Sequence, residues 1–422
     1  MMKNYLEMVQ SVERDREALI FSDHVYTYGN LVDLALEQQR RFCLEGGKQQ
    51  LAVIRKTSIL EQLVSFLACQ GTGAVPLIVP ADTAVPDAFF ETEIPDNACM
   101  AVMTSGTTGN GKLLFRTFES WYGYFETQNR IFGISGESRL FAQGSLAFTG
   151  NLNLYMGQLA AGGTLIAEDV FLPGKWEQVM ARERANGIYL IPSKLLMLPR
   201  VFKGVNANIR TIISGSQSLG RKDAEVLKKI FPNTEITLYY GASELNYITY
   251  VKSADMTEER NLIGKPFPGV RVFIQDDEMY VDNAFHVENI TVPYSLKDSG
   301  RMDAQGNFYF LGRTDDIVGV RGRKVSMMKI ENALEEVAGI TEAAVVLLPK
   351  EKDADMPAEI VSAFVTVEGT DVPENLRQQL KEKLADFEIP KRVIVLEAFP
   401  KNTSGKVDKA RLKKMWIEQE PQ

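Results

Sequence analysis

The chain has 422 residues, too many for one small hydrophobic core, so two or more domains are expected. Its hydrophobic content of 45% and charged content of 24% are ordinary for a globular protein, and its net charge of −8 disfavours a nucleic-acid-binding surface. The two histidines lie far apart in sequence, which disfavours a histidine-rich metal site and a Ser-His-Asp triad.

The cysteines and the N-terminal residues indicate the cellular location of the protein. The three cysteines form no C-x-x-C pair, which indicates reduced thiols rather than a disulfide framework. Residues 1–15 carry charges throughout and lack the apolar core of a signal peptide, and no stretch approaches about 18 consecutive apolar residues. We therefore expect a cytoplasmic protein with no membrane span and no nucleic-acid partner.

Helical and strand-like patterns alternate in residues 1–96. Helices are expected over 28–43 and 58–70, and strands over 50–54 and 74–79. This β-α-β rhythm predicts a parallel sheet with helices packed against it.

A loop rich in glycine and hydroxyl residues follows the apolar run 98–103, which predicts a buried strand. The loop reads Thr104-Ser105-Gly106-Thr107-Thr108-Gly109-Asn110-Gly111-Lys112. Glycines let backbone N–H groups turn towards an anion, and the hydroxyls and lysine add donors and charge, so the loop suits a polyphosphate. Leu113 follows Lys112, so the loop does not match the Walker spacing. Taken alone, it is equally compatible with an ordinary flexible turn.

The alternation continues beyond Lys112 as far as Gly241. Helices are expected over 118–132, 152–160, 176–186, 193–198 and 221–230. One strand is expected to start at residue 139, and further strands are expected over 164–167, 188–191, 211–214 and 234–238.

Short strands and turns take over from about residue 263, at 270–274, 278–281 and 308–311. This spacing predicts a β-barrel-like or meander part. A separate α+β domain is expected to begin near residue 315. Its helices are predicted over 327–337 and 374–384, and its strands over 343–348, 360–367 and 392–395.

Further polar segments lie at places where ligands bind in open α/β sheets. Residues 240–244, Y-G-A-S-E, end a predicted strand, and a glutamate beside a serine there suits Mg²⁺ held against a phosphate, although a polar turn is an equal alternative. Residues 298–301 and 312–316 flank a predicted strand. An acidic side chain there would accept hydrogen bonds from ribose hydroxyls, and the alternative interpretation is a solvated hairpin. Residues 400–409 hold three lysines, and a charged surface loop is the alternative there.

Together these segments resemble, in order, the motifs of the AMP-forming acyl-adenylate synthetases, which include acyl-CoA synthetases, adenylation domains, aryl-acid ligases and luciferases. The matches are T-S-G-T-T-G-x-x-K at 104–112, Y-G-x-S-E at 240–244, the Asp298 segment, G-R-x-D-D at 312–316 and P-K-N-T-S-G-K at 400–406. Weaker matches lie at 27–31, 214–219 and 264–269.

The resemblance implies an α/β fold with two domains. Residues 1–314 would form a large N-terminal domain of parallel α/β subdomains with a small β-barrel-like part. Residues 315–422 would form a small, mobile α+β domain that carries Lys406. Asp315 stands at the family's hinge position, about which the second domain swings between two half-reactions.

The same resemblance implies the reaction. ATP, with Mg²⁺, activates a carboxylic acid to acyl-AMP and pyrophosphate, and a thiol then displaces AMP. Coenzyme A is the expected thiol, and the phosphopantetheine of an acyl carrier protein is the alternative. A third reading, a non-catalytic nucleotide-binding homologue, is disfavoured because the charged residues of every motif are present.

Most of the implied site residues bind the nucleotide. The residues implied to hold the β- and γ-phosphates are Thr104, Ser105, Gly106, Thr107, Thr108, Gly109 and Lys112. Those implied at the adenine slot are Gly215, Ser216, Gln217, Tyr240 and Gly241. Asp298 and Arg313 are implied to bind the ribose.

Three residues are implied to act on the reacting groups. Ser243 would contact the α-phosphate and Glu244 the Mg²⁺. Lys406 would bridge the carboxylate and α-phosphate oxygens, for which a compact cation on a flexible stem is suited.

The acid pocket departs from the family. Residues 144–151 lack the histidine common in acyl-CoA synthetases, and Thr149 stands where adenylation domains hold the substrate ammonium with an aspartate. An α-amino acid is therefore disfavoured, and we expect a fatty or aryl acid lined by Phe148, Thr149, Asn151 and Ser193. In the phosphate loop, Gly111 stands where the family usually has proline.

Overall fold

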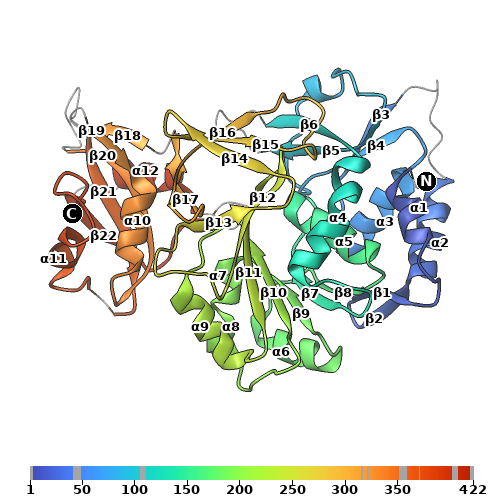
Figure 1. The fold of residues 1–422 in the computed structure, drawn as a ribbon, viewed down its shortest axis with the longest axis horizontal. Coiled ribbons are helices and arrows are strands. Elements are labelled where there is room, and N and C mark those ends of the chain that lie inside the picture. The colour runs from blue at the N-terminus through green and yellow to red at the C-terminus, as the bar shows by residue number, and fades with distance from the viewer. Residues whose placement is uncertain are drawn as a thin grey trace. The chain divides into compact units, whose positions relative to one another are not determined.

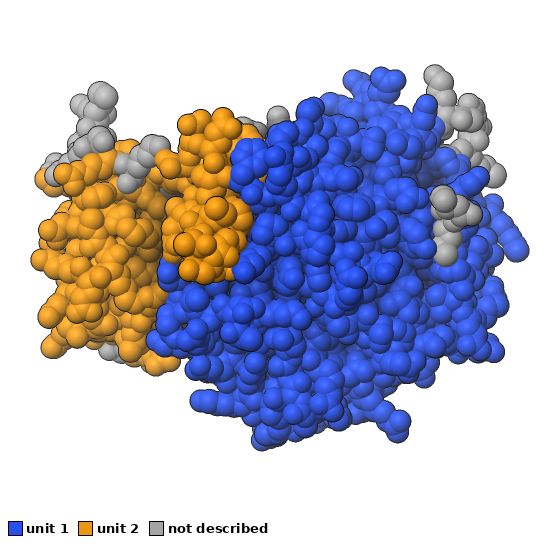
Figure 2. Space-filling model, in the orientation of Figure 1, with its two compact units in different colours: residues 1–273, 281–294 blue, residues 274–280, 295–422 orange. Residues whose placement is uncertain are grey.

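The computed structural model describes residues 3–40, 49–104, 111–314, 317–320, 323–350, 359–369, 371–401 and 407–418. The chain divides into two compact units, of residues 1–273 with 281–294 and of residues 274–280 with 295–422 (Figure 2). The chain passes between them within β14 (Arg271–Gln275), β15 (Glu278–Asp282) and β16 (Tyr294–Met302).

The smaller sheet of unit 1 carries the predicted phosphate loop. Its strands, in spatial order, are β3 (Gln50–Ile54), β4 (Ala74–Ile78), β5 (Ala98–Thr104) and β6 (Lys112–Thr117). The first three are parallel, and β6 runs antiparallel to β5. The predicted loop therefore joins two neighbouring strands as a hairpin.

The larger sheet of unit 1 has a parallel centre and antiparallel ends. Its central strands β8, β7, β9, β10 and β11 are parallel neighbours, and β1 joins them parallel to β8. β2, β12 and β13 are antiparallel. In spatial order the strands are β13 (Leu262–Pro266), β12 (Asn246–Lys252), β11 (Glu235–Ala242), β10 (Thr211–Gly215), β9 (Gly187–Tyr189), β7 (Arg139–Gln143), β8 (Thr164–Glu168), β1 (Glu17–Phe21) and β2 (His24–Thr27).

Helices cover these sheets (Figure 1). α4 (Glu119–Phe132) contacts β6 of the smaller sheet, β10 of the larger sheet and its neighbour α5 (Thr149–Ala160). The others are α1 (Tyr5–Gln10), α2 (Tyr28–Gln39), α3 (Ile59–Cys69), the short η1 (Asp87–Phe89), α6 (Pro173–Arg182), α7 (Pro192–Leu195), α8 (Leu198–Val201) and α9 (Arg221–Ile230).

Unit 2 contains an α+β sandwich built on a sheet of β20 (Ile340–Pro349), β21 (Glu359–Val367) and β22 (Arg392–Val395). Successive side chains of a strand point to opposite faces. Val345 thus packs in a cluster with α10 (Met327–Glu335), whereas Val346 packs in another with Leu412 of α12 (Lys409–Glu418). The remaining elements are β17 (Phe308–Arg313), β18 (Ile317–Val320), β19 (Arg323–Ser326) and α11 (Leu376–Lys381).

Several element boundaries differ from the sequence-based prediction for local reasons. The helix expected over 176–186 ends at Arg182, since Arg184 has a left-handed φ of 51°. The helix expected over 193–198 is two short helices, because Pro199 has no N–H to donate and is tolerated in the first turn of α8, which begins at Leu198. The helix expected over 28–43 ends at Gln39, and Cys43 lies outside the described residues.

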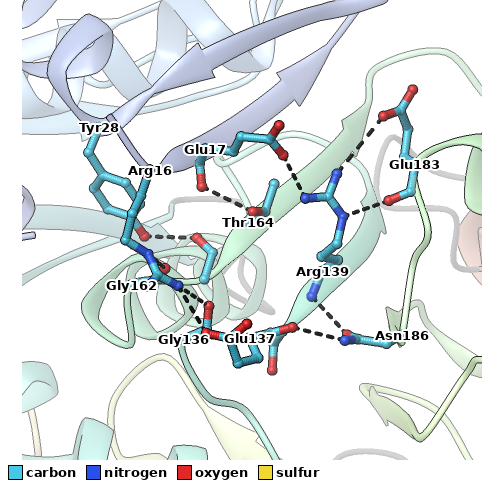
Figure 3. A network of polar contacts seen from close by, with 12 residues as sticks. Arg16, Glu17, Tyr28, Gly136, Glu137, Arg139, Gly162, Thr164, Glu183 and Asn186 are labelled. Carbon is cyan, nitrogen blue, oxygen red and sulfur yellow. Dashed lines mark hydrogen bonds and ion pairs between the residues drawn. The ribbon is translucent and has the colours of Figure 1, made fainter. Parts of the chain in front are cut away.

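A network of polar contacts, from exposed to fully buried, ties the N-terminal elements to the larger sheet (Figure 3). Arg139 at the start of β7 forms an ion pair with Glu17 of β1, 2.6 Å between Nη1 and Oε2. The Arg16 guanidinium donates to the carbonyls of Gly162 and Gly136. The fully buried Tyr28 places its hydroxyl 2.8 Å from the carbonyl oxygen of Gly163. None of the helices in the described part of the chain has the length and apolarity that a bilayer crossing requires.

Replacing Tyr28 with phenylalanine is expected to destabilise unit 1 by about 1–2 kcal/mol, because the carbonyls of Leu159 and Gly163 lose a buried donor. The midpoint of urea unfolding measures this. Tyr26→Phe is the control, since that half-buried ring donates no such bond. Equal midpoints for the two variants would contradict a stabilising role for the Tyr28 hydroxyl.

Candidate active site

The base of the predicted phosphate loop is a closely paired strand end. Thr104, the last residue of β5, pairs with Lys112, the first residue of β6, and residues 105–110 lie outside the described residues. A Cβ on Gly111 would lie 2.8 Å from the carbonyl oxygen of Thr104, closer than packed atoms allow. Glycine is therefore required at 111 by the close approach of the two strands.

A cleft of about 680 Å³ opens beside the start of β6. Its polar lining residues are Thr92, Lys112, Asn289, Thr291 and Tyr294, and the others are glycine or apolar. Such a volume lies within the usual range of ligand pockets. The described residues that line it are Ala88, Phe89, Thr92, Gly111, Lys112, Leu113, Leu114, Asn289, Ile290, Thr291 and Tyr294.

The Y-G-A-S-E segment covers the end of β11 and the start of the tight turn to the antiparallel strand β12. A Cβ on Gly241 would lie 2.6 Å from the carbonyl oxygen of Asn246, so the turn has no space for a side chain there. Ser243 and Glu244 follow, both half-buried. The Ser243 hydroxyl donates to Oγ1 of Thr149 at 2.9 Å. The predicted α-phosphate residue and a predicted acid-pocket residue thus touch, although 94 positions separate them.

The N-terminus of α5 lies at this contact, because Thr149 is its first residue. Phe148 at the N-cap provides no side-chain acceptor for the first-turn N–H groups. Unsatisfied N–H groups and the helix dipole make such a terminus favourable for an anion. The Ser243–Thr149 pair therefore lies where a carboxylate or a phosphate oxygen would be stabilised.

Arg116 of β6 is fully buried beneath the turn, a position that sequence reasoning did not single out. Its Nη2 donates to the carbonyl oxygen of Ser243 at 2.6 Å, and its Nη1 to the carbonyl of Phe285 at 3.1 Å and to Oγ of Ser120 at 3.2 Å. The guanidinium also lies 5.3 Å from the Trp121 ring centroid. Its acceptors among the described residues are carbonyl and hydroxyl oxygens.

Burial lowers the pKa of Arg116 to about 10, against the opposing influence of Tyr5, Cys99 and Glu244. The guanidinium therefore stays charged at neutral pH. A buried charge is tolerated only where fixed polar groups replace its lost hydration. The turn that carries Ser243 is among those groups, so its backbone is held in one position.

A second link joins β6 to the same turn. Within the segment 283–289, the Val287 N–H donates to the carbonyl of Glu244 and the Glu288 N–H to the carbonyl of Phe115, each at 2.9 Å. Because β6 begins at Lys112, the end of the phosphate loop and the Ser243 turn are fastened to one strand.

The predicted adenine-slot residues lie at the ends of β10 and β11. A Cβ on Gly215 would lie 2.6 Å from the Tyr239 ring, so glycine is required there, and Ser216 has a left-handed φ of 70°. Oε1 of Gln217 accepts from the Ser193 N–H at 2.9 Å, which brings a predicted nucleotide residue against a predicted acid-pocket residue. Half-buried Tyr240 pairs with Thr249 of β12.

The other predicted acid-pocket residues lie around the first turn of α5. Phe148 is 39% exposed, and the Asn151 amide donates to the carbonyl of Ser145 at 2.9 Å. A Cβ on Gly150 would lie 3.0 Å from the hydroxyl of Tyr239 and 3.1 Å from that of Tyr189. Glycine at 150 therefore allows the close approach of two tyrosine hydroxyls, which also lie 3.1 Å from each other.

In unit 2, Asp298 of β16 and Arg313 of β17 face each other in register, with 3.5 Å between Oδ1 and Nε. Asp298 is 4% exposed. The two residues predicted to bind the ribose are therefore an ion pair. Asp315 and Lys406 lie outside the described residues, so their predicted roles stay predictions.

The donor set fits a phosphate-bound magnesium ion rather than a dedicated metal cage. Among the described residues no group of three or more His, Cys, Asp or Glu side chains converges. Mg²⁺ in nucleotide sites is held by one or two carboxylates together with phosphates and water. Glu244, half-buried beside Ser243, is a carboxylate suited to that part.

Two family models match the chain. That of the AMP-binding enzymes matches residues 82–284, and that of their C-terminal domain matches residues 329–406.

The chain belongs to the AMP-forming acyl-adenylate synthetases.

Individual members of the superfamily are distant in sequence. The uncharacterized acyl–CoA ligase YhfT of Bacillus subtilis (strain 168) is 26% identical over 348 residues, which is 78% of this chain and 70% of the relative. The 2-succinylbenzoate–CoA ligase of Listeria monocytogenes serotype 4b (strain F2365) is 25% identical over 379 residues, 86% of this chain and 79% of the relative.

Solved structures share the whole fold. The O-succinylbenzoate coenzyme A synthetase MenE from Bacillus subtilis, in complex with ATP and magnesium ion, superposes with a TM-score of 0.82 at 19% identity, covering 98% of this chain and 99% of that one. The predicted family and the predicted α/β fold class, with a large N-terminal part and a small α+β C-terminal part, are confirmed. The protein is an AMP-forming ligase.

Arg116→Met is expected to slow acid-dependent ATP–pyrophosphate exchange by about 10²-fold, because the Ser243 turn loses its buried charged donor. Arg116→Lys keeps the charge but has only one nitrogen, so its exchange rate is expected to lie between those of the unmodified protein and Arg116→Met. Thermal melting of each variant separates folding from catalysis. Full exchange activity in a folded Arg116→Met protein would contradict the positioning role.

Proposed function

We propose that the protein joins a fatty or aryl carboxylic acid to coenzyme A in two half-reactions at one site. In the first, a carboxylate oxygen attacks the α-phosphorus of ATP, the bond between the α-phosphorus and the bridging oxygen breaks, and pyrophosphate leaves. In the second, the thiolate of coenzyme A attacks the acyl carbon, and the bond to AMP breaks. Acyl-CoA and AMP are the products.

The contact between Thr149 and Ser243 carries the proposal. It joins the residues expected around the acid to the turn expected at the α-phosphate, and the α5 N-terminus lies at the junction. Two anions must meet for adenylation, so fixed donors where charge accumulates are the main requirement of catalysis.

The remaining roles follow the motif order. Lys112 and the loop before it bind the β- and γ-phosphates, Glu244 binds Mg²⁺, and Gly215, Gln217 and Tyr240 border the adenine. Asp298 and Arg313 bind the ribose hydroxyls. The MenE complex with ATP and magnesium ion supports ATP and Mg²⁺ as the cofactors.

Lys406 supplies the positive charge between the carboxylate and the α-phosphate, and Asp315 is the hinge that removes it for thioester formation. The domain boundary at 314/315 belongs to this proposal. The relative YhfT, an acyl–CoA ligase by name, supports coenzyme A over a carrier protein as the thiol.

Lys406→Ala is expected to slow acyl-AMP formation by about 10²-fold or more, the usual scale for a lost transition-state charge partner. Thioester formation from supplied acyl-AMP should persist, since that step occurs with Lys406 away from the site. Stopped assays of each half-reaction measure the two rates. Lys401→Ala is the control, because that lysine forms an ion pair with Glu342 instead. An equal loss in both half-reactions would contradict the domain swing.

The acid and the thiol are identified by one further experiment. ATP–pyrophosphate exchange across fatty, aryl and amino acids is expected to favour the first two classes, because Thr149 supplies no carboxylate for a substrate ammonium. The preferred acid is then incubated with coenzyme A or with a phosphopantetheinylated carrier protein, and the thioester is identified by mass spectrometry. Thioester on the carrier alone would replace coenzyme A as the acceptor.

A further inference from the structure

Lys194 of α7 is a half-buried ammonium group surrounded by neutral partners. Its Nζ donates to Oε1 of Gln143 at 2.5 Å and lies 5.9 Å from the centroid of the Phe171 ring. Burial lowers the pKa of Lys194, and no acidic group opposes the shift. Among the described residues no carboxylate forms an ion pair with it.

The ammonium lies at the edge of the larger sheet where ligands bind in parallel α/β folds. Gln143 is the last residue of β7, Phe171 follows the end of β8, and Lys194 follows the end of β9. These three strands are parallel neighbours. The polar group of Lys194 is therefore held at the carboxyl ends of the central strands.

The same group adjoins the predicted acid pocket. A Cβ on Gly144 would lie 3.8 Å from Nζ of Lys194 and 2.9 Å from Nδ2 of Asn151, so both nitrogens flank a position that carries no side chain. Ser193, the neighbour of Lys194, is fastened to Gln217 by its backbone N–H. The cation thus lies beside Asn151 and Ser193, two residues expected to line the acid.

A partly desolvated cation beside the predicted acid pocket would be stabilised by an anion. A carboxamide oxygen returns only part of the hydration that an ammonium loses on burial, whereas a carboxylate would return charge as well as hydrogen bonds. A purely structural role, holding the end of β7 through Gln143, would need a donor but no charge.

On the basis of the proposed function, we propose that Lys194 binds a second carboxylate, at the far end of the substrate. The enzyme then activates dicarboxylic acids in preference to the matching monocarboxylic acids. Phe171 and Phe148, both partly exposed, provide apolar surface for the carbon skeleton between the two carboxylates.

The test compares matched acids in ATP–pyrophosphate exchange: suberate with octanoate, and terephthalate with benzoate. The unmodified protein is expected to have the higher kcat/KM for the diacid of one or both pairs. Lys194→Met is expected to lower kcat/KM for the diacid by roughly 30-fold or more and to leave the monoacid unchanged, because only the diacid loses a charge partner. Lys194→Glu is expected to move the preference towards the matching ω-amino acid.

Lys203→Met is the matched control, since Lys203 is exposed in the same unit. A parallel loss for diacid and monoacid in Lys194→Met would overturn the proposal and assign Lys194 a structural role. A preference of the unmodified protein for the monoacids in both pairs would also overturn the proposal. This comparison needs no variant, so the proposal can be tested even if Lys194→Met folds poorly. Exchange with none of these acids, nor with any in the wider panel, would overturn the proposed function itself.

Discussion

The buried guanidinium of Arg116 is the interaction on which the geometry of the Ser243 turn in unit 1 depends. One cation binds the carbonyl of Ser243, the carbonyl of Phe285 and the hydroxyl of Ser120, and therefore joins three separate segments. A surface ion pair would contribute little and permit movement. A buried charge requires its acceptors to stay in place, because moving them would leave the desolvated guanidinium without partners. The turn that carries Ser243 and Glu244 is therefore held rigid.

That rigidity matters because the two reactants are both anions. The Ser243 hydroxyl and the first turn of α5 meet at Thr149, where uncapped N–H groups provide partial positive charge. Donors fixed before the reaction stabilise developing charge without reorganising during it. Lys112, at the other end of the strand that carries Arg116, lines the cleft beside the predicted phosphate loop, so β6 joins that cleft to the Ser243 turn.

The predicted acid side of the site is built differently. Glycine at 150 allows the close approach of two tyrosine hydroxyls, and glycine at 144 allows that of the Asn151 amide next to the Lys194 ammonium. Polar groups there have neutral partners within the protein, in contrast to the charged and tightly bonded surroundings of Ser243.

The sequence by itself determined the family, the order of the elements and the positions of the nucleotide motifs. The strand over 50–54 and the helix over 221–230 have the predicted bounds, because alternating and helical apolar patterns are local properties of the chain. It did not predict β6 and β12. Both are second strands of hairpins, and each follows a segment that was interpreted as a ligand-binding loop.

Only the tertiary structure decided which of the chain's arginines and lysines lie inside it. Arg116 and Lys194 look in the sequence like any other basic residues, since the free energy of a charge depends on burial and on partners far away in the chain. Ser243 and Arg116 are 127 positions apart, and Ser193 and Gln217 are joined by a contact between two strand ends. No local pattern encodes such distances, because they arise from the packing of the two sheets of unit 1 and the helices on them.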